Sequence, residues 1–376
     1  MKVVSVVGAR PQFVKAAPLS RFLRGEHHEL LVHTGQHYDD ALSAAFFRDL
    51  EMPDPDANLD VGSGSHATQT AEIMRRLEPL LLEQEPDGIV VYGDTNSTLA
   101  AAVVASRIAF AGGRRPWLAH VEAGLRSFNP VMPEERNRIV ADHLADLLLA
   151  PTATAMRNLA HEGLGDRARL VGDVMLDAFE WAASRAEAHL PAVAADLHGY
   201  ALLTLHRAEN VDDPIRLAAL LSGLHGARPL IFPIHPRTRR SIDDAGLTVP
   251  DNIRLLDPVG YLAMVALERH AAAIATDSGG VQKEAYLAGV PCVTLRTETE
   301  WLETVAAGWN RVIGDEPESA AAAVEEAASM DRAAPRPALF GDGHAAERIV
   351  RALEELDRAH AGGAAVLSAR PTAARA

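Results

Sequence analysis

The sequence predicts an α/β fold built from two doubly wound parallel-sheet domains. Short apolar runs alternate along the chain with helical patterns, as expected when helices cover both faces of a parallel sheet. The alternation occurs in two successive sets, and 376 residues are too many for one small core. We therefore expect a first domain at residues 1–170, a second at 171–345, a helix at about 346–360 that packs back on the first domain, and a disordered tail at 361–376.

The first domain opens with an apolar strand at residues 2–7, followed by a helix with proline in its first turn. Strands are expected next at 29–34, 88–92, 117–121 and from 148. The first four of these five strands run into loops that contain glycine and polar residues. Helices are expected at 98–111 and from Pro133, where the apolar positions form one helical stripe.

The second domain repeats this order, with strands expected at 201–205, 230–234, 253–256, 271–276 and 291–295. Polar residues follow the carboxyl ends of most of these strands, as they do in the first domain. In doubly wound sheets a ligand binds outside the carboxyl ends of the strands. The sequence therefore predicts a ligand in a crevice between the two domains.

The stretch 277–284, Asp-Ser-Gly-Gly-Val-Gln-Lys-Glu, connects a strand to a helix that is expected to stop at Gly289. The backbone N–H groups at the start of a helix and the positive end of its dipole form a phosphate site. The backbone at Gly279 and Gly280 allows close approach of a ligand, Ser278 precedes them, and Glu284 could accept hydrogen bonds from a ribose. An ordinary strand–helix turn that needs glycine for its geometry is the alternative.

Composition excludes several classes of protein. The net charge of −15 argues against a nucleic-acid partner, and the apolar run 99–111 is too short and too polar to span a membrane. The single cysteine, Cys292, lies in a strand-like run and is expected to be a core residue in a reducing compartment. The first strand is too short and too rich in valine for a signal peptide. We expect a cytoplasmic protein.

Several charged residues follow strands in the first domain. Arg10 and Lys15 flank the first helix and are candidates for binding an acidic ligand. Asp94 follows an apolar strand, where it either acts chemically or caps the next helix. Glu122 follows a strand and is not at the start of a helix, so capping does not explain it. Glu134 and Glu135 begin a helix, and at least one of them is expected only to complement the helix dipole.

Histidines are the remaining candidates: His206 and His235 follow strands of the second domain, and His37 and His120 lie in the first. A histidine in such a place more often completes a local hydrogen bond than catalyses. The sequence has no metal-ligand motif, no G-x-G-x-x-G dinucleotide motif and no G-x-S-x-G nucleophile motif. What remains is an acid–base site that acts on a nucleotide-linked substrate.

The motifs resemble those of the non-hydrolysing bacterial UDP-N-acetylglucosamine 2-epimerases, whose two-domain architecture is called GT-B. They run through the chain in order: Gly8-Ala9-Arg10-Pro11 with Lys15, Thr34-Gly35-Gln36-His37, Gly93-Asp94-Thr95, His120-Val121-Glu122-Ala123-Gly124-Leu125-Arg126, Pro133-Glu134-Glu135-Arg136-Asn137-Arg138, His206-Arg207, and Thr276-Asp277-Ser278-Gly279-Gly280. Seven motifs in this order are far more specific than any one of them.

The resemblance implies that UDP leaves C1 of the sugar while the C2 proton is removed, and that UDP adds again after a proton arrives on the other face. The intermediate is a 2-acetamidoglucal. Asp94, Glu122, Glu134 and His206 are the implied catalytic residues. The implied substrate-binding residues are Arg10, Lys15, Ser278, Gly279, Gly280 and Glu284. No metal or nicotinamide cofactor is implied, and the family suggests a homodimer.

Some positions depart from the pattern of many family members. Trp301 replaces a substrate-binding arginine, and Tyr38 follows Gln36-His37 where a second, activating UDP-sugar site would have arginine, so we do not expect that regulation. These departures resemble the branch that acts on UDP-2,3-diacetamido-glucuronate, in which Arg237, Arg239 or Arg240 could bind a carboxylate; a solvated basic turn is the alternative we favour. A hydrolysing epimerase, a GT-B glycosyltransferase and a non-enzymatic nucleotide-sugar sensor are the competing hypotheses.

Overall fold

The computed structural model describes residues 1–36 and 47–368, and contacts divide the chain into two compact units. Unit 1 comprises Met1–Ala178 together with the segment from Phe340, and unit 2 comprises Phe179–Leu339. The first boundary lies inside helix α7 (Val174–Ala183), so one helix carries the chain from unit 1 into unit 2. His37, Tyr38 and Asp39, on which the expectation about a second UDP-sugar site depends, lie outside the described residues.

Within the described residues, unit 1 contains a parallel sheet of seven strands in the order β3-β2-β1-β4-β5-β6-β7. The apolar runs form its central strands, as expected for strands covered on both faces. The strands are β1 (Lys2–Val7), β2 (His28–His33), β3 (Ala57–Asn58), β4 (Gly88–Tyr92), β5 (Trp117–Val121), β6 (Leu147–Ala150) and β7 (Ala168–Leu170).

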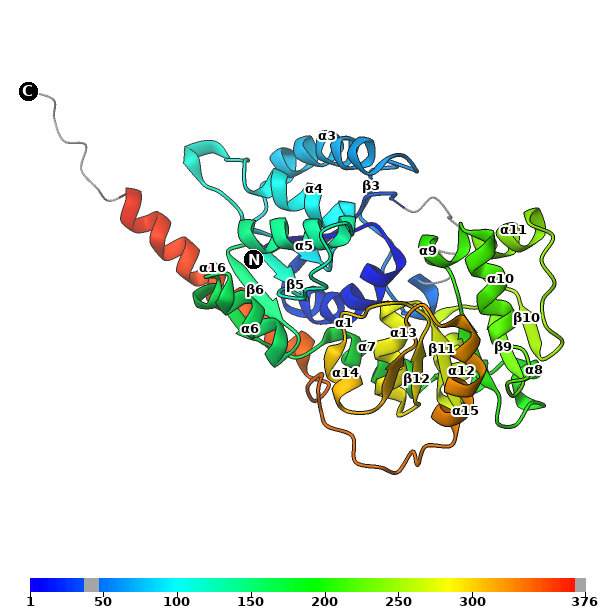
Figure 1. Cartoon of the computed structure of the whole chain (residues 1–376). Helices are drawn as coiled ribbons and strands as arrows, with labels where there is room; N and C mark the ends of the chain where they lie inside the picture. The colour runs from blue at the N-terminus through cyan, green and yellow to red at the C-terminus, as the bar shows by residue number, and fades with distance from the viewer. Residues whose placement is uncertain (37–46, 369–376) are drawn as a thin grey trace, which may run out of the picture. The chain divides into compact units, whose positions relative to one another are not determined.

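Helices cover both faces of this sheet. On one face α4 packs between α3 and α5, and a core of Val4, Val6, Ile89 and Val91 lies beneath them (Figure 1). On the other face α1 packs against α16. The helices are α1 (Arg10–Glu26), α3 (His66–Gln84), α4 (Asn96–Ala105), α5 (Pro133–Leu144), α6 (Ala153–His161) and α16 (Ala345–Ser368).

Helix α16 returns the end of the chain to unit 1. The Asp177 carboxylate accepts hydrogen bonds from the amides of Ala345 and Ala346 at 3.2 and 2.9 Å, which fixes the start of the helix. Further along, Asp357 accepts a hydrogen bond from the Trp117 indole at 3.0 Å. The helix continues to Ser368, so the first part of the segment expected to be disordered is helical, in keeping with the helix propensity of its alanines.

Unit 2 contains a second parallel sheet, of six strands among the described residues, in the order β10-β9-β8-β11-β12-β13. Along β8, Leu203 packs with helices α10, α11 and α15, whereas Leu202 packs on the opposite face with α12 and α13. The strands are β8 (Ala201–Thr204), β9 (Leu230–Pro233), β10 (Ile253–Leu256), β11 (Ala273–Thr276), β12 (Cys292–Thr294) and β13 (Asn310–Val312).

The helices of unit 2 connect these strands and cover both faces of the sheet (Figure 1). They are α8 (Ala192–Ala195), α9 (Ala208–Val211), α10 (Pro214–Gly223), α11 (Pro236–Asp244), α12 (Tyr261–His270), α13 (Gly279–Ala288), α14 (Leu302–Ala306) and α15 (Ala320–Ala328). Cys292 is buried, and burial raises the pKa of its thiol to about 12.

Each sheet reverses its strand order at one point, between β1 and β4 in unit 1 and between β8 and β11 in unit 2. The loops on either side of such a switch point diverge and leave room for a ligand. The candidate residues follow these strands: Asp94 comes after β4, His206 after β8 and Ser278 after β11. The topology therefore places the predicted chemistry at the two positions where doubly wound sheets bind ligands.

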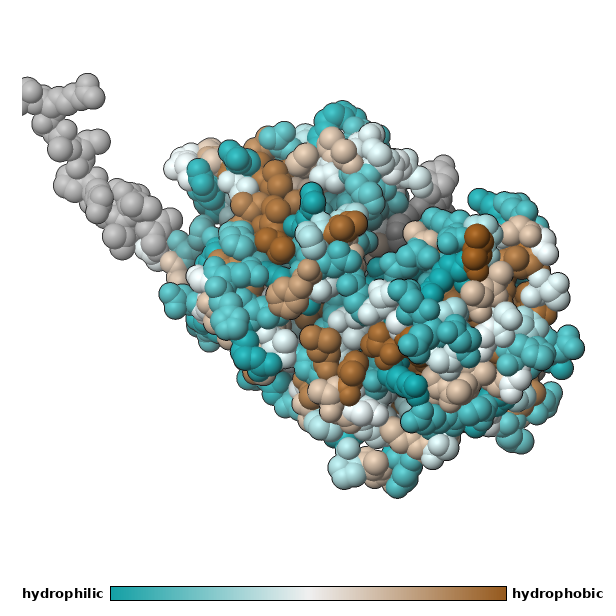
Figure 2. Space-filling model, in the orientation of Figure 1, coloured by the Kyte–Doolittle hydropathy of each residue, from teal (hydrophilic) through white to brown (hydrophobic). Residues whose placement is uncertain are grey.

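The surface of the described residues shows no long apolar helix. None of their helices has the length and apolar character needed to cross a bilayer. On the face drawn in Figure 2, hydrophobic residues form separate groups among hydrophilic ones. Individual apolar side chains are nevertheless well exposed, among them Val131 and Ile215.

Candidate active site

The switch point of unit 1 brings together Lys15, from α1, and Glu122, from the end of β5. Their side chains form a buried ion pair, with 10% of the lysine and 5% of the glutamate side chain exposed. Glu122 has a φ of 69°, in the left-handed region that is costly for residues other than glycine. The backbone after β5 therefore turns in a strained conformation that places this carboxylate against the lysine.

Gly93, directly after β4, lies against the ion pair of Lys15 and Glu122. Its φ is 59°, and a Cβ added there would lie 2.9 Å from Lys15 Nζ and 3.2 Å from Glu122 Oε2. We expect Gly93→Ala to lower kcat at least tenfold, because displacing the pair by a fraction of an ångström misaligns the reacting groups. Steady-state kinetics check this. Gly112, which also has a positive φ but no neighbour within 4 Å, provides the control Gly112→Ala, which should keep full activity.

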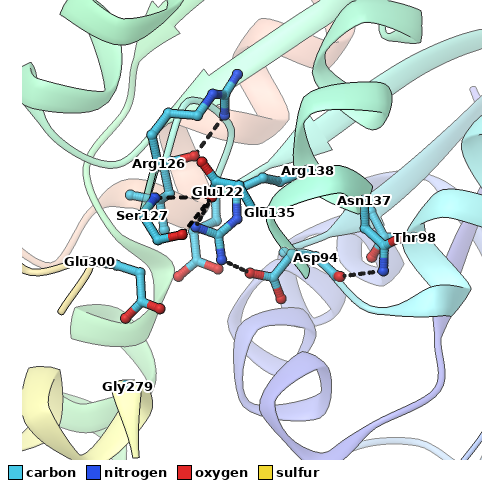
Figure 3. Close-up of polar contacts among 12 residues, drawn as sticks. Asp94, Thr98, Glu122, Arg126, Ser127, Glu135, Asn137, Arg138, Gly279 and Glu300 are labelled. Carbon is cyan, nitrogen blue, oxygen red and sulfur yellow. Dashed lines mark hydrogen bonds and ion pairs between the residues drawn. The ribbon is translucent and has the colours of Figure 1, made fainter. Parts of the chain in front are cut away.

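Asp94 pairs with an arginine that the sequence analysis gave no role. Its carboxylate forms an ion pair with Arg138 of α5, and its carbonyl oxygen accepts a hydrogen bond from Asn137 at 2.9 Å (Figure 3). The alternative reading, that Asp94 caps the next helix, is wrong, because the N-cap of α4 is Thr95. The Asp94 side chain remains 28% exposed, so the ion pair leaves the carboxylate accessible to a ligand.

Glu135 holds the loop between β5 and α5. Its carboxylate accepts hydrogen bonds from the Ser127 and Phe128 amides at 2.9 and 3.0 Å. It also forms an ion pair with Arg138 at 3.1 Å (Figure 3). Phe128 has a φ of 59°, which is costly for a residue with a side chain. Glu135 is thus a structural residue that fixes a strained loop and, through Arg138, the position of Asp94.

Glu134 and Arg10 both lie at the start of a helix in unit 1. Glu134 lies half-buried in the first turn of α5, beside the structural Glu135. Its place there also suits the helix dipole, which was the alternative reading. Arg10 begins α1, but its side chain lies outside the described part of the molecule.

A second charged network joins α5 to β5 and the residues that follow it. Asp142 of α5 is fully buried, accepts a hydrogen bond from the Gly124 amide at 3.1 Å, and pairs with Arg126 at 2.8 Å and with His120 at 2.7 Å. Burial by itself raises the pKa of Asp142, but the hydrogen bonds and charges of His120 and Arg126 outweigh it and hold the pKa below its usual value. His120 Nε2 also lies 2.7 Å from the Gly93 carbonyl oxygen, so both ring nitrogens of His120 have partners in this part of unit 1.

His206 and Asp277 meet at the switch point of unit 2. The imidazole Nδ1 lies 3.2 Å from the buried Asp277 carboxylate, and 41% of the histidine side chain is exposed. Burial raises the pKa of Asp277, but hydrogen bonds and charge from His206, together with the Arg207 amide, bring it below its usual value. Asp277 therefore orients the imidazole of His206 through Nδ1, while the side chain stays partly exposed.

The Ser-Gly-Gly turn starts helix α13, as the sequence predicts. Ser278 is the N-cap, with its hydroxyl accepting from the Val281 amide at 3.4 Å, and Gly279 and Gly280 form the half-exposed first turn. The amides of such a turn have no partner within the helix. The helix ends at Gly289, where φ is 66°, as expected.

Glu284, the residue expected to contact a ribose, is buried in unit 2. It is 6% exposed and lies near Tyr261 and the fully buried Glu268. Burial raises its pKa to about 7, although Tyr261, Glu268 and Lys283 act to lower it.

Of the arginines considered for a carboxylate, Arg237 and Arg239 have partners: Arg237 pairs with Asp212, and Arg239 lies 3.4 Å from Asp257. These side chains are well exposed, as the favoured alternative expected, but they lie on helix α11 and not in a turn. Among the described residues, the one group with a geometry that could hold a metal is Glu26, His27 and Glu354, between α1 and α16. His27 and Glu354 already pair there at 3.0 Å.

The comparisons with known proteins agree with the architecture. A family model described as UDP-N-acetylglucosamine 2-epimerase matches residues 23–354. A Methanococcus maripaludis UDP-N-acetylglucosamine 2-epimerase homolog is 44% identical over 366 residues, which cover 95% of this chain and 100% of the relative. The Pseudomonas aeruginosa UDP-2,3-diacetamido-2,3-dideoxy-D-glucuronate 2-epimerase is 42% identical over 369 residues, which cover 95% and 100%.

The solved structures give the same result. The crystal structure of Methanocaldococcus jannaschii UDP-GlcNAc 2-epimerase in complex with UDP-GlcNAc and UDP has a TM-score of 0.85 and 39% identity, and the match covers 94% of this chain and 100% of that one. Two doubly wound units with polar groups at each switch point define a GT-B-like enzyme. The chain belongs to the UDP-N-acetylglucosamine 2-epimerase family, which confirms the resemblance seen in its motifs.

Proposed function

We propose that the chain epimerises C2 of a UDP-N-acetyl sugar, converting UDP-GlcNAc to UDP-ManNAc, without net hydrolysis. The observation that carries this proposal is the pair of carboxylates at the switch point of unit 1, each ion-paired with a cation: Glu122 with Lys15 and Asp94 with Arg138. Carboxylates can accept a proton from the substrate and return one to it. The family relationship supports UDP-GlcNAc as the substrate.

In the proposed reaction, one carboxylate removes the C2 proton while the bond between C1 and the diphosphate oxygen breaks with its electrons going to oxygen. The products of this step are UDP and a 2-acetamidoglucal. A proton then arrives at C2 on the opposite face, and UDP adds again at C1, so no cofactor is consumed. We assign the two faces to Glu122 and Asp94, with Glu134 assisting.

Unit 2 supplies the groups that suit the leaving diphosphate. The amides of Gly279 and Gly280, the Ser278 hydroxyl and His206 can donate hydrogen bonds as negative charge builds on the oxygen. Arg10 and Lys15 add positive charge in unit 1, and Glu284 is assigned to the ribose.

The test is to incubate the chain with UDP-GlcNAc and analyse the nucleotides and sugars by NMR. We expect UDP-ManNAc to accumulate to an equilibrium ratio that is also reached from UDP-ManNAc. Accumulation of free ManNAc with stoichiometric UDP would show a hydrolysing enzyme. Transfer of the sugar to an acceptor would show a glycosyltransferase, and binding without turnover would show a sensor.

A modified sugar is a second candidate substrate, because the Pseudomonas aeruginosa relative named for UDP-2,3-diacetamido-2,3-dideoxy-D-glucuronate is 42% identical. Comparing kcat/KM for UDP-GlcNAc and this uronate decides between them.

We also propose, from the family resemblance, that the protein is a cytoplasmic homodimer. Light scattering after size-exclusion chromatography tests the dimer, and cell fractionation tests the location.

A further inference from the structure

Trp301 contacts the glycine turn of unit 2 directly. The residue follows β12 and immediately precedes α14, and it is 4% exposed. Its indole Nε1–H donates a hydrogen bond to the Gly279 carbonyl oxygen at 2.8 Å.

The face of the same indole contacts a buried cation. The Lys283 ammonium, one helical turn after Gly279 on α13, lies 4.3 Å from the centroid of the ring. Lys283 is fully buried, and a cation over a desolvated indole is attracted to the ring's negative face. Trp301 therefore binds α13 at two places, through its edge at Gly279 and through its face at Lys283.

The segment before Trp301 is fixed to the same turn. The Thr299 hydroxyl donates to Gln282 Oε1 at 2.6 Å and accepts from the Trp301 amide at 3.1 Å. Asn310 of β13 donates to the same Gln282 oxygen at 3.2 Å. These bonds leave the indole little freedom to move relative to the first turn of α13.

The hydrogen bond to Gly279 has a consequence for the next residue. The Gly279 carbonyl and the Gly280 N–H belong to one planar trans peptide, in which they point in opposite directions. A group that fixes the carbonyl therefore also fixes the direction of the Gly280 N–H. Two glycines in a first helical turn otherwise favour fraying, because glycine loses more conformational freedom in a helix than other residues.

We propose that Trp301 is a positioning residue that holds the Ser-Gly-Gly turn with its amides aimed at the diphosphate. This inference rests on the proposed function, since it takes the turn to be the diphosphate site. Trp301 acts through the Gly279–Gly280 peptide and need not touch the substrate. The affinity for the phosphates therefore depends on the hydrogen bond between Trp301 and Gly279, whereas the affinity for the nucleoside does not.

The experiment compares UDP with uridine as ligands of the Trp301→Phe variant, which keeps a buried ring and loses the indole N–H. We expect the dissociation constant for UDP, measured by calorimetry, to rise about three- to tenfold, as for the loss of one hydrogen bond. The dissociation constant for uridine, measured by ligand-observed NMR, should stay within twofold. Thermal unfolding confirms that the variant is folded.

Trp309→Phe is the matched control, because Trp309 is equally buried in unit 2 and packs edge-on against Tyr286 with ring centroids 6.3 Å apart. Unchanged UDP affinity in Trp301→Phe would overturn the inference, as would equal losses for UDP and uridine or an equal UDP loss in the control. If the unaltered chain binds UDP no more tightly than uridine, the turn is not a diphosphate site; the proposed function then fails before any variant is compared.

Discussion

Glu122→Gln is expected to lower kcat for C2 epimerisation by about 10²- to 10⁴-fold, the range typical of a lost general acid–base group. Glutamine has nearly the same shape and can still accept a hydrogen bond from Lys15, but it cannot take up the C2 proton. Steady-state kinetics with UDP-GlcNAc measure the loss. UDP binding, which we assign to unit 2, should change much less, and calorimetry checks this.

The control for this variant is Glu78→Gln, which removes the charge of an exposed glutamate on α3 in the same unit. Its kcat should equal that of the unaltered chain. If Glu122→Gln kept more than a tenth of the original kcat while remaining folded, Glu122 would not exchange the proton. Asp94→Asn would then be the next variant to compare.

Asp142→Ala is expected to have the largest effect on stability, lowering the free energy of unfolding of unit 1 by about 3–5 kcal/mol. The substitution removes one of the two carboxylates that pair with the buried Arg126 and the carboxylate that pairs with the buried His120. An unpaired buried charge costs far more than an exposed one. Asp166→Ala, at an exposed position of the same unit, should change stability by less than about 0.5 kcal/mol.

Two units can unfold separately, so the measurement should report on unit 1 alone. Trp117 is buried in unit 1, whereas Trp181, Trp301 and Trp309 belong to unit 2. Urea titration of fluorotryptophan-labelled protein, followed by ¹⁹F NMR, resolves the Trp117 resonance from the others. A Trp117 transition that is unshifted in Asp142→Ala would contradict the structural role of the network.

The stabilisation from Asp142 should also depend on pH. Its pKa is lower in the folded chain than the usual value near 3.9, so the folded state binds its proton less readily than the unfolded state. The stabilisation is therefore present above about pH 4 and is lost as the pH falls through the lower, folded pKa. The stability difference between Asp142→Ala and the unaltered chain should shrink over that acidic range.

Some of this structure could be predicted because the relevant signal is local. The strands at 2–7 and 88–92 have the predicted bounds, since continuous apolar runs specify strands covered on both faces. Asp94 and Glu122 were found because a lone carboxylate after such a strand is unusual. The short edge strands β3, β7 and β13 were missed, because two or three residues with mixed burial form no pattern.

The partners of the candidate residues could not be predicted in the same way. Arg138 and Asp142 lie far along the chain from Asp94 and His120, so only the fold shows that they pair. One signal was present: Glu135, Arg138 and Asp142 are three or four residues apart, which places them on one face of a helix. The positive φ values of Glu122 and Phe128 could not be predicted from the sequence, because neither residue is a glycine.

In the proposed reaction, carboxylates of unit 1 exchange the proton at C2 of the sugar. Incubation with UDP-GlcNAc in deuterated water tests it most directly, with ¹H NMR and mass spectrometry of the recovered nucleotide sugars. We predict that the UDP-ManNAc formed carries deuterium at C2, that recovered UDP-GlcNAc acquires it with time, and that Glu122→Gln suppresses both. An epimer that retains its original hydrogen at C2 would contradict the account.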